Sequence, residues 1–208
     1  MTGLRERKKE RTRSGISAAA IALFLERGYD QVSVAEVAEA AEVSKRTLFA
    51  YFPTKDDLVL HRFADHEDEP ARVVRARPAG VSPLAALHGH LRAALERRDP
   101  VSGLCDDPGV VRFYRLVVET PALSAAIVRY HARAEDALAA ALLDGVPAAS
   151  ALTARLAAGQ ILVTLRTLAA ANLARIMAGA AAEAVAPSAA AEADDAFALL
   201  GGGLTPYR

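Results

Sequence analysis

Three capping residues, each followed directly by proline, restrict the fold of this chain more than any other pattern in it. A short polar side chain before a helix accepts a hydrogen bond from a free backbone N–H, and proline suits the first helical position because its fixed φ matches the helix. The pairs Ser82-Pro83, Asp107-Pro108 and Thr120-Pro121 therefore predict helices over about 83–98, 108–119 and 121–143.

Two more helices are expected near the end of the chain, because alanine has the highest helix propensity of all residues. A long alanine-rich helix is predicted from about residue 149 to 182, and a short one from 188 to 200, with Pro187 between them. No segment alternates apolar and polar residues as a half-buried strand does. The chain is therefore predicted to be all-α.

The N-terminal part predicts shorter helices. A stripe of apolar residues from Ile16 to Phe24 indicates a first helix over residues 5–27, which Gly28 ends. Ser33 and Glu36 have the spacing of a capping box, which opens a short second helix.

A third and a fourth helix follow. Ser44 is placed to cap a third helix in which Leu48 and Phe52 share one face. The fourth is expected from Thr54 to Glu69, since Pro70 is placed to end it.

A domain boundary is expected after this fourth helix, because residues 71–81 mix arginine, proline and glycine without helical periodicity. We therefore predict one domain over residues 1–69 and a second over residues 70–208. Residues 1–55 carry ten Lys and Arg against seven Asp and Glu, so the front has a net charge of +3 and the remainder −3. A basic head on an acidic body suits a polyanionic partner at one end.

Length and composition favour a soluble, cytoplasmic protein. No uncharged run reaches the roughly 18 residues needed to cross a bilayer, and no apolar core with a cleavage site follows the basic N-terminus. Contact with a membrane is not expected. The single cysteine, Cys105, cannot form an internal disulfide.

The second and third predicted helices, at 33–40 and 44–52, have the outline of a helix-turn-helix. Arginine and lysine donate to guanine or phosphate, threonine bonds a base edge or touches a thymine methyl, and tyrosine donates to phosphate. Lys55, just past the third helix, adds another phosphate donor. The side chains left available on the third helix are Lys45, Arg46, Thr47, Phe49 and Tyr51.

Four short segments resemble the head of the TetR family of transcriptional regulators: Gly28–Asp30, Ser33–Ala38, Val43–Phe49 and Tyr51–Lys55. The similarity spans roughly residues 5–60. It implies an N-terminal three-helix helix-turn-helix DNA-binding domain and a C-terminal helical domain for ligand binding and dimerisation.

The resemblance also implies roles for single residues. Lys45, Arg46, Thr47 and Phe49 would face base edges, while Tyr51 and Lys55 would contact phosphates. Ser33 would hold the N-terminus of the second helix, whose amides can also meet a phosphate. With Ser44, the cap of the reading helix, these residues make up the predicted DNA-binding set.

Two residues depart from the family pattern. Glu42 stands where the family often has glycine in the turn, so it must either adopt a left-handed conformation, at a cost of about 1 kcal/mol, or form a different turn. Ala50 stands where many relatives have an aromatic residue or histidine, so one backbone contact is expected to be missing. The base preference of the family is therefore not transferable.

The basic N-terminal run has two interpretations. It is either a flexible arm that reaches phosphates or the minor groove, or the solvated charged start of a helix. The run consists of Arg5, Arg7, Lys8, Lys9, Arg11 and Arg13.

By resemblance, the body would enclose a cavity for a small-molecule effector, in which a few polar groups orient the ligand. Arg112 pairing with an acidic residue, and Gln160 making a dimer contact, are the alternatives. The candidate lining residues are His88, Arg112, Phe113, Tyr130, Gln160, Thr164 and Thr167.

The last two helices, about 149–182 and 188–200, would by resemblance pair with their copies in a second chain and form a homodimer. Packing inside one chain is the alternative explanation for their small residues. His61, Asp65 and His66 do not give three converging ligands, so no metal, cofactor or catalytic residue is predicted.

The sequence thus predicts a DNA-binding regulator and not an enzyme. Its expected form is a dimeric repressor that a small molecule releases from a palindromic DNA operator. The alternative is a ligand-independent regulator or activator whose C-terminal domain is a protein-interaction module.

Overall fold

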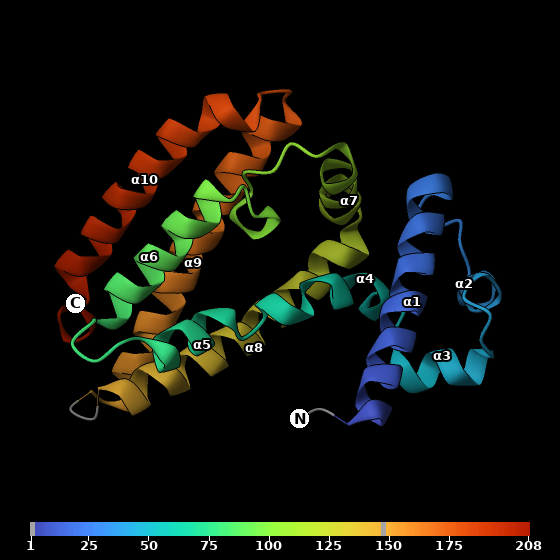
Figure 1. Ribbon diagram of the computed structural model, residues 1–208, viewed down its shortest axis with the longest axis horizontal. Helices are drawn as coiled ribbons and strands as arrows, with labels where there is room; N and C mark the ends of the chain where they lie inside the picture. The colour runs from blue at the N-terminus through green and yellow to red at the C-terminus, as the bar shows by residue number, and fades with distance from the viewer. Residues whose placement is uncertain (1–2, 147–148) are drawn as a thin grey trace. The chain divides into compact units, whose positions relative to one another are not determined.

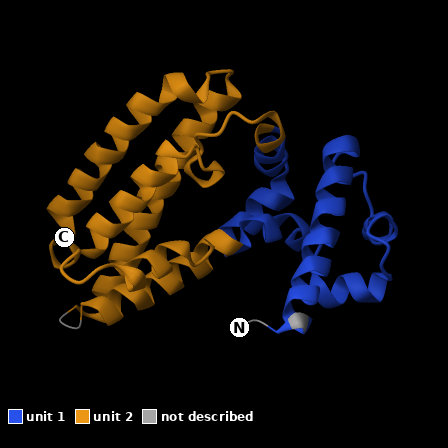
Figure 2. Ribbon diagram, in the orientation of Figure 1, with its two compact units in different colours: residues 1–64, 112–129 blue, residues 65–111, 130–208 orange. Residues whose placement is uncertain are grey.

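The computed structural model describes residues 3–146 and 149–208, which fold into helices joined by short loops (Figure 1). No β-strand occurs in these ranges, so the all-α prediction is confirmed. The chain divides into two compact units (Figure 2). Unit 1 comprises residues 1–64 and 112–129, and unit 2 comprises residues 65–111 and 130–208.

Unit 1 contains the predicted helix-turn-helix. Its helices are α1 (Leu4–Arg27), α2 (Val34–Ala40), α3 (Lys45–Tyr51) and α4 (Asp57–Leu60). It also takes in the end of α7 (Pro108–Glu119) and the start of α8 (Pro121–Gly145). The two proline-led starts at Pro108 and Pro121 lie where the sequence predicts them.

The core of unit 1 explains why residues 112–129 belong to this unit. Phe24 of α1, Leu48 of α3 and Leu58 of α4 are buried in one apolar cluster with Phe113 and Leu123, which come from α7 and α8. Residues far beyond the predicted boundary therefore complete the core of the head. Unit 1 differs from the predicted domain 1–69 in this respect, because no local sequence pattern indicates that residues of α7 and α8 pack into its core.

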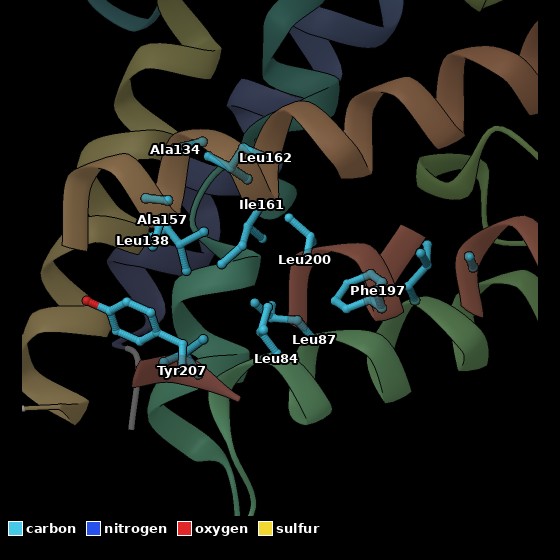
Figure 3. Close-up of a cluster of buried hydrophobic side chains, with 14 of the residues drawn as sticks. Leu84, Leu87, Ala134, Leu138, Ala157, Ile161, Leu162, Phe197, Leu200 and Tyr207 are labelled. Atoms are coloured by element: carbon cyan, nitrogen blue, oxygen red, sulfur yellow. The ribbon is translucent and has the colours of Figure 1, made fainter. Parts of the chain in front are cut away.

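Unit 2 is built around α6 (Pro83–Glu96), α9 (Ala151–Met177) and α10 (Ala182–Gly203), and α10 packs against both of the others. The later part of α8 completes its core, and α5 (Glu69–Ala76) packs against α6. Figure 3 shows side chains of α6, α8, α9 and α10 pointing into this core. Tyr207, in the short 3-10 helix η3 (Thr205–Tyr207), is fully buried there.

The predicted fourth helix is wrong in its extent. It ends as α4 at Leu60, continues as the 3-10 helix η1 (His61–His66), and a separate helix, α5, starts at Glu69. Pro70, taken as the end of a helix, lies in the first turn of α5, where proline lacks only an N–H that would have no helical partner. Most of the expected boundary segment 71–81 is therefore helical.

The predicted break at Pro187 is also wrong, because α10 begins at Ala182 and runs through Pro187. The backbone N–H of Ala182 donates to Asp106 Oδ2 at 2.8 Å. A side chain 76 residues earlier thus satisfies a free N–H at the start of the helix. Local sequence could not reveal a cap supplied by tertiary structure.

The loop that supplies this cap is held closely against α9. Asn172, buried in α9, donates from Nδ2 to the carbonyl oxygen of Ser102 at 3.0 Å. Gly103 has a φ of 73° and leaves no room for a side chain, since an added Cβ would lie 2.0 Å from the carbonyl oxygen of Ala169. Glycine is required at this position by conformation and by contact.

Helix α9 is long and apolar enough, by length and composition alone, to cross a bilayer. It is the one such helix in the described part of the chain. It also carries Arg155, Arg166 and Arg175, and it buries Asn172. These residues fit a helix that packs in an aqueous protein better than one exposed to lipid.

Two histidines of unit 2 have pKa values displaced in opposite directions. His66 shares a hydrogen bond of 2.8 Å with Glu69 Oε2, which raises the pKa of His66 above its ordinary 6.5. His90 lies 3.2 Å from the other Glu69 oxygen. On α8, burial and then the charge of Arg166 lower the pKa of His131 from 6.5 to about 4.

Replacing Gly103 by alanine is expected to destabilise the protein by about 3 kcal/mol, because it adds left-handed strain to a backbone clash. Thermal unfolding should then shift down by roughly 10 °C. Gly89→Ala is the matched control, since Gly89 is exposed inside α6 with open space around its Cβ position. That control should gain about 0.5–1 kcal/mol. Equal effects of the two variants would contradict this account.

The two histidines should give opposite pH dependences of stability. The unfolded chain protonates His131 near pH 6.5 and the folded chain only near 4, so the protein loses stability as pH falls through this window. His131→Asn should reduce that loss. His66 stabilises the protein below pH 6.5, and this contribution disappears as pH rises through its raised pKa. His66→Asn should therefore destabilise more at pH 5.5 than at pH 9, as melting temperatures across pH would show.

Candidate nucleic-acid interface

The orientation of α3 is set by two buried side chains. Leu48 and Phe52 are completely buried in the core of unit 1. Because they lie four residues apart, they define the inward face of the helix. The residues left exposed on α3 are Lys45, Arg46, Phe49 and Ala50.

Local caps define both helices of the motif. Ser33 Oγ accepts from the Glu36 N–H at 3.3 Å, and Glu36 Oε2 accepts from the Ser33 N–H at 2.8 Å, which is the predicted capping box. Hydrogen bonds from the Ser33 backbone and side chain, together with the one from Arg27, lower the pKa of Glu36 to about 2. Ser44 Oγ caps α3 by accepting from the Thr47 N–H at 3.0 Å.

The capping box limits what Ser33 can do for DNA. Its N–H is already bonded to a carboxylate that also pairs with Arg27 at 2.6 Å. A phosphate bonded to the Ser33 N–H would have to displace that carboxylate. Ser33 thus has the predicted capping role, and contact of the amides at the start of α2 with a phosphate stays a prediction.

The turn between α2 and α3 is a Schellman motif. The Glu42 N–H donates to the Glu39 carbonyl at 3.0 Å, and the Val43 N–H donates to the Ala38 carbonyl at 2.9 Å. Glu42, which has a φ of 53°, occupies the left-handed position that glycine normally fills. Of the two alternatives expected for this residue, the chain adopts the strained one.

The exposed cations of α3 are available to an external partner. Across the described ranges, no carboxylate forms an ion pair with Lys45 or Arg46. Thr47 is half-buried, and its hydroxyl lies 2.7 Å from that of Ser44. Tyr51 is half-buried against the core of unit 1, which leaves only part of its side chain for a phosphate contact.

Lys55 has a role inside the head that the sequence does not reveal. Its ammonium group lies 4.1 Å from the centre of the Tyr29 ring and donates to the Tyr29 carbonyl. Burial lowers the pKa of Lys55, although three nearby carboxylates oppose this shift. The Tyr29 hydroxyl in turn donates to Asp56. A contact between Lys55 and a phosphate stays a prediction. It would use the N–H donors of the ammonium group that these contacts leave free.

The basic N-terminal run is helical from Leu4 onward, as the solvated-helix interpretation expects. Its cations Arg5, Lys8 and Arg11 are exposed. Arg13 differs from them, because its guanidinium carbon lies 5.4 Å from the centre of the Phe52 ring. Arg13 thus packs against the head.

The predicted effector-binding residues do not gather in one place. Phe113 belongs to the core of unit 1, where its ring lies 5.5 Å from that of Phe63, and Arg112 is an exposed residue of the same unit. In unit 2, His88 lies 2.8 Å from Asp194 and stacks on Phe197.

The remaining predicted effector-binding residues differ in burial and in hydrogen bonding. Tyr130 is buried in α8. Gln160 and Thr167 are exposed on α9, and the Thr164 and Thr167 hydroxyls bond back to carbonyls of their own helix. Side-chain type and helical spacing alone could not separate these environments. In the parts of the chain that the structure describes, no group of three His, Cys, Asp or Glu residues could hold a metal ion.

Together, the buried anchor, the two caps and the exposed cations define unit 1 as a helix-turn-helix module. Residues 16–61 match the family model for bacterial regulatory proteins of the tetR family. The HTH-type transcriptional regulator TcmR of Streptomyces glaucescens is 38% identical over 138 residues, which cover 66% of this chain and 61% of that protein. RutR of Escherichia coli strain K12 is 34% identical over 98 residues, or 46% and 45% of the two chains.

The family model, these curated relatives and the fold all support a regulator of the TetR family. The chain spans less than two thirds of the length of these curated relatives. The relatives are transcriptional regulators, which confirms that the chain is not of an enzyme family. Its fold matches that of NalD, described as the secondary repressor of the MexAB-OprM multidrug efflux pump in Pseudomonas aeruginosa, with a TM-score of 0.59 at 18% identity over 90% of this chain and 96% of that one.

Replacing Glu42 by glycine is expected to stabilise the protein by about 1 kcal/mol, because glycine adopts the left-handed conformation without strain. The melting temperature should rise by roughly 2–4 °C. Glu42→Gln is the matched control, since it removes the charge and keeps the strain. A gain in both variants would assign the effect to charge, and no gain with glycine would contradict the strain argument.

Proposed function

We propose that this chain is a DNA-binding transcriptional regulator that acts as a dimeric repressor and is released from a palindromic operator by a small molecule. One observation carries the proposal: a capped helix, α3, holds Lys45, Arg46 and Phe49 outward, and the two cations have no partner in the described chain. The match of residues 16–61 to the TetR family model supports the same function. Such a helix has the composition that major-groove reading requires.

The contacts proposed for each residue follow from the exposure of its side chain. Lys45 and Arg46 would donate to guanine edges or phosphates, while Tyr51 and Lys55 would donate to phosphates. The exposed cations at the start of α1 are further candidates for phosphate contacts. Each phosphate that the protein neutralises steepens the dependence of log affinity on log salt by about 0.9.

The dimer is proposed to form through α9 and α10. Leu152, Leu156 and Val163 make an exposed apolar stripe on α9, and Leu156 is 58% exposed. On α10, Leu199 is exposed beside small residues that permit close approach of a second helix. Arg155 and Gln160 share the exposed side of α9, so a second copy of the chain suits this face better than lipid does. We accordingly place the protein in the cytoplasm.

Regulation is proposed to start from an effector bound in unit 2. Helices α7 and α8 each have residues in both units, so a change in either helix within unit 2 can be passed along one continuous element. A coupling free energy of about 1–3 kcal/mol between the two sites suffices for a useful switch. The scattered positions of the predicted lining residues keep the alternative open, in which the C-terminal part is a protein-interaction module and no ligand is needed.

A mobility-shift assay on the DNA upstream of the chain's own gene tests both halves of the proposal. The wild type should bind as a dimer of twice 21.9 kDa, and a small set of metabolites should weaken this complex. Arg46→Ala should reduce affinity by about tenfold or more, as expected for one lost base contact in each half-site. The double variant Leu156→Glu, Val163→Glu should sediment as a monomer and lose operator binding.

Val118→Glu is the matched control for the double variant, because Val118 is similarly exposed, at 56%, but lies on α7. It should remain a dimer that binds DNA. A double variant that stays dimeric would contradict the proposed interface. Tight DNA binding that no metabolite alters would favour the ligand-independent alternative.

A further inference from the structure

An aromatic ring projects from the reading helix without serving the fold. Phe49 is 48% exposed on α3. Leu48 and Phe52 already bury the inward face of this short helix, so Phe49 is not needed to anchor it. An apolar area that water solvates poorly is expected to be covered in the functional complex.

The neighbours of Phe49 indicate what covers it. Arg46 and Lys45 precede it by three and four residues and therefore share its face of the helix. Both are exposed, and neither forms an ion pair within the described ranges. The partner must therefore be a polyanion that presents an apolar group between its charges. This charge complementarity favours the DNA groove over an apolar protein surface.

The chemistry of base edges restricts the contact further. In the major groove, guanine, adenine and cytosine present hydrogen-bonding groups, whereas thymine also presents its C5-methyl group. A phenyl ring that covers donors or acceptors leaves them unpaired, at a cost in free energy. The same ring gains free energy when it covers a methyl group.

We infer that Phe49 selects thymine in each half-site of the operator through its C5-methyl group. Thr47, whose methyl group can make the same kind of contact, is half-buried, whereas Phe49 is exposed. The inference rests on the proposed function and adds a base specificity to it. Phe49 is thus a specificity-determining residue whose contact is apolar and not a hydrogen bond.

The test replaces the methyl group and nothing else. Binding sites are first selected from a random pool of duplex DNA with the full-length protein, and each thymine of the selected site is then replaced by deoxyuridine. One thymine position in each half-site should weaken binding by about fourfold when replaced, and both together by about fifteenfold, as expected for the loss of one buried methyl group each.

The protein variants complete a double-mutant cycle. Phe49→Ala should bind the thymine and deoxyuridine sites equally, because the ring that senses the methyl group is gone. Phe49→Leu, which keeps an apolar side chain, should retain part of the discrimination. Val118→Ala, which removes similarly exposed apolar surface outside α3, should leave the wild-type ratio unchanged.

The outcomes separate this inference from the proposed function. If no sequence is enriched from the pool, DNA binding itself fails and the inference fails with it. If sites are enriched but deoxyuridine is tolerated at every position, only the inference is overturned. It is also overturned if Phe49→Ala keeps the full discrimination, because another residue then reads the methyl group.

Discussion

The burial of Leu48 and Phe52 is the interaction on which the rest of the head depends. Each side chain contributes about 1.5–3 kcal/mol when it leaves water, and both lie on one face of a two-turn helix. This pairing fixes the rotation of α3 about its own axis. The outward positions of Lys45, Arg46 and Phe49 are then a geometric consequence, since side chains of a helix cannot turn to another face without unpacking the core.

The core that receives these two side chains is not built by the head sequence alone. Phe113, Val117 and Leu123 come from α7 and α8, about sixty residues later in the chain, and are buried in the same cluster. The helices that stabilise the DNA-reading element thus continue into the unit where we propose that an effector binds. The stability of the head and its proposed regulation therefore both depend on α7 and α8. A change in either helix is expected to affect both properties.

Two residues of the head, one on each side of α3 in the sequence, depart from what local sequence predicts. Glu42 adopts a left-handed conformation three residues before α3, and Lys55 lies over the ring of Tyr29 four residues after α3. Sequence comparison with the family pattern drew attention to Glu42, because the expected residue was glycine. Nothing marked Lys55 in this way, since a lysine near a DNA-binding helix is expected to reach phosphate, and its partner ring lies 26 residues earlier.

The all-helical fold, the helix-turn-helix and most helix starts follow from local sequence patterns, because caps, prolines and apolar periodicity act over three to seven residues. Other features depend on partners far away in the chain: the start of α10 on Asp106, the close packing of Gly103 on α9, and the place of Phe113 in the head core. Tertiary structure likewise gave different surroundings to the predicted effector-binding residues, which are equivalent in sequence pattern. Backbone groups form hydrogen bonds, and apolar side chains pack, with whichever partner the folded chain brings near. That partner can lie far away in the sequence, where no local pattern identifies it.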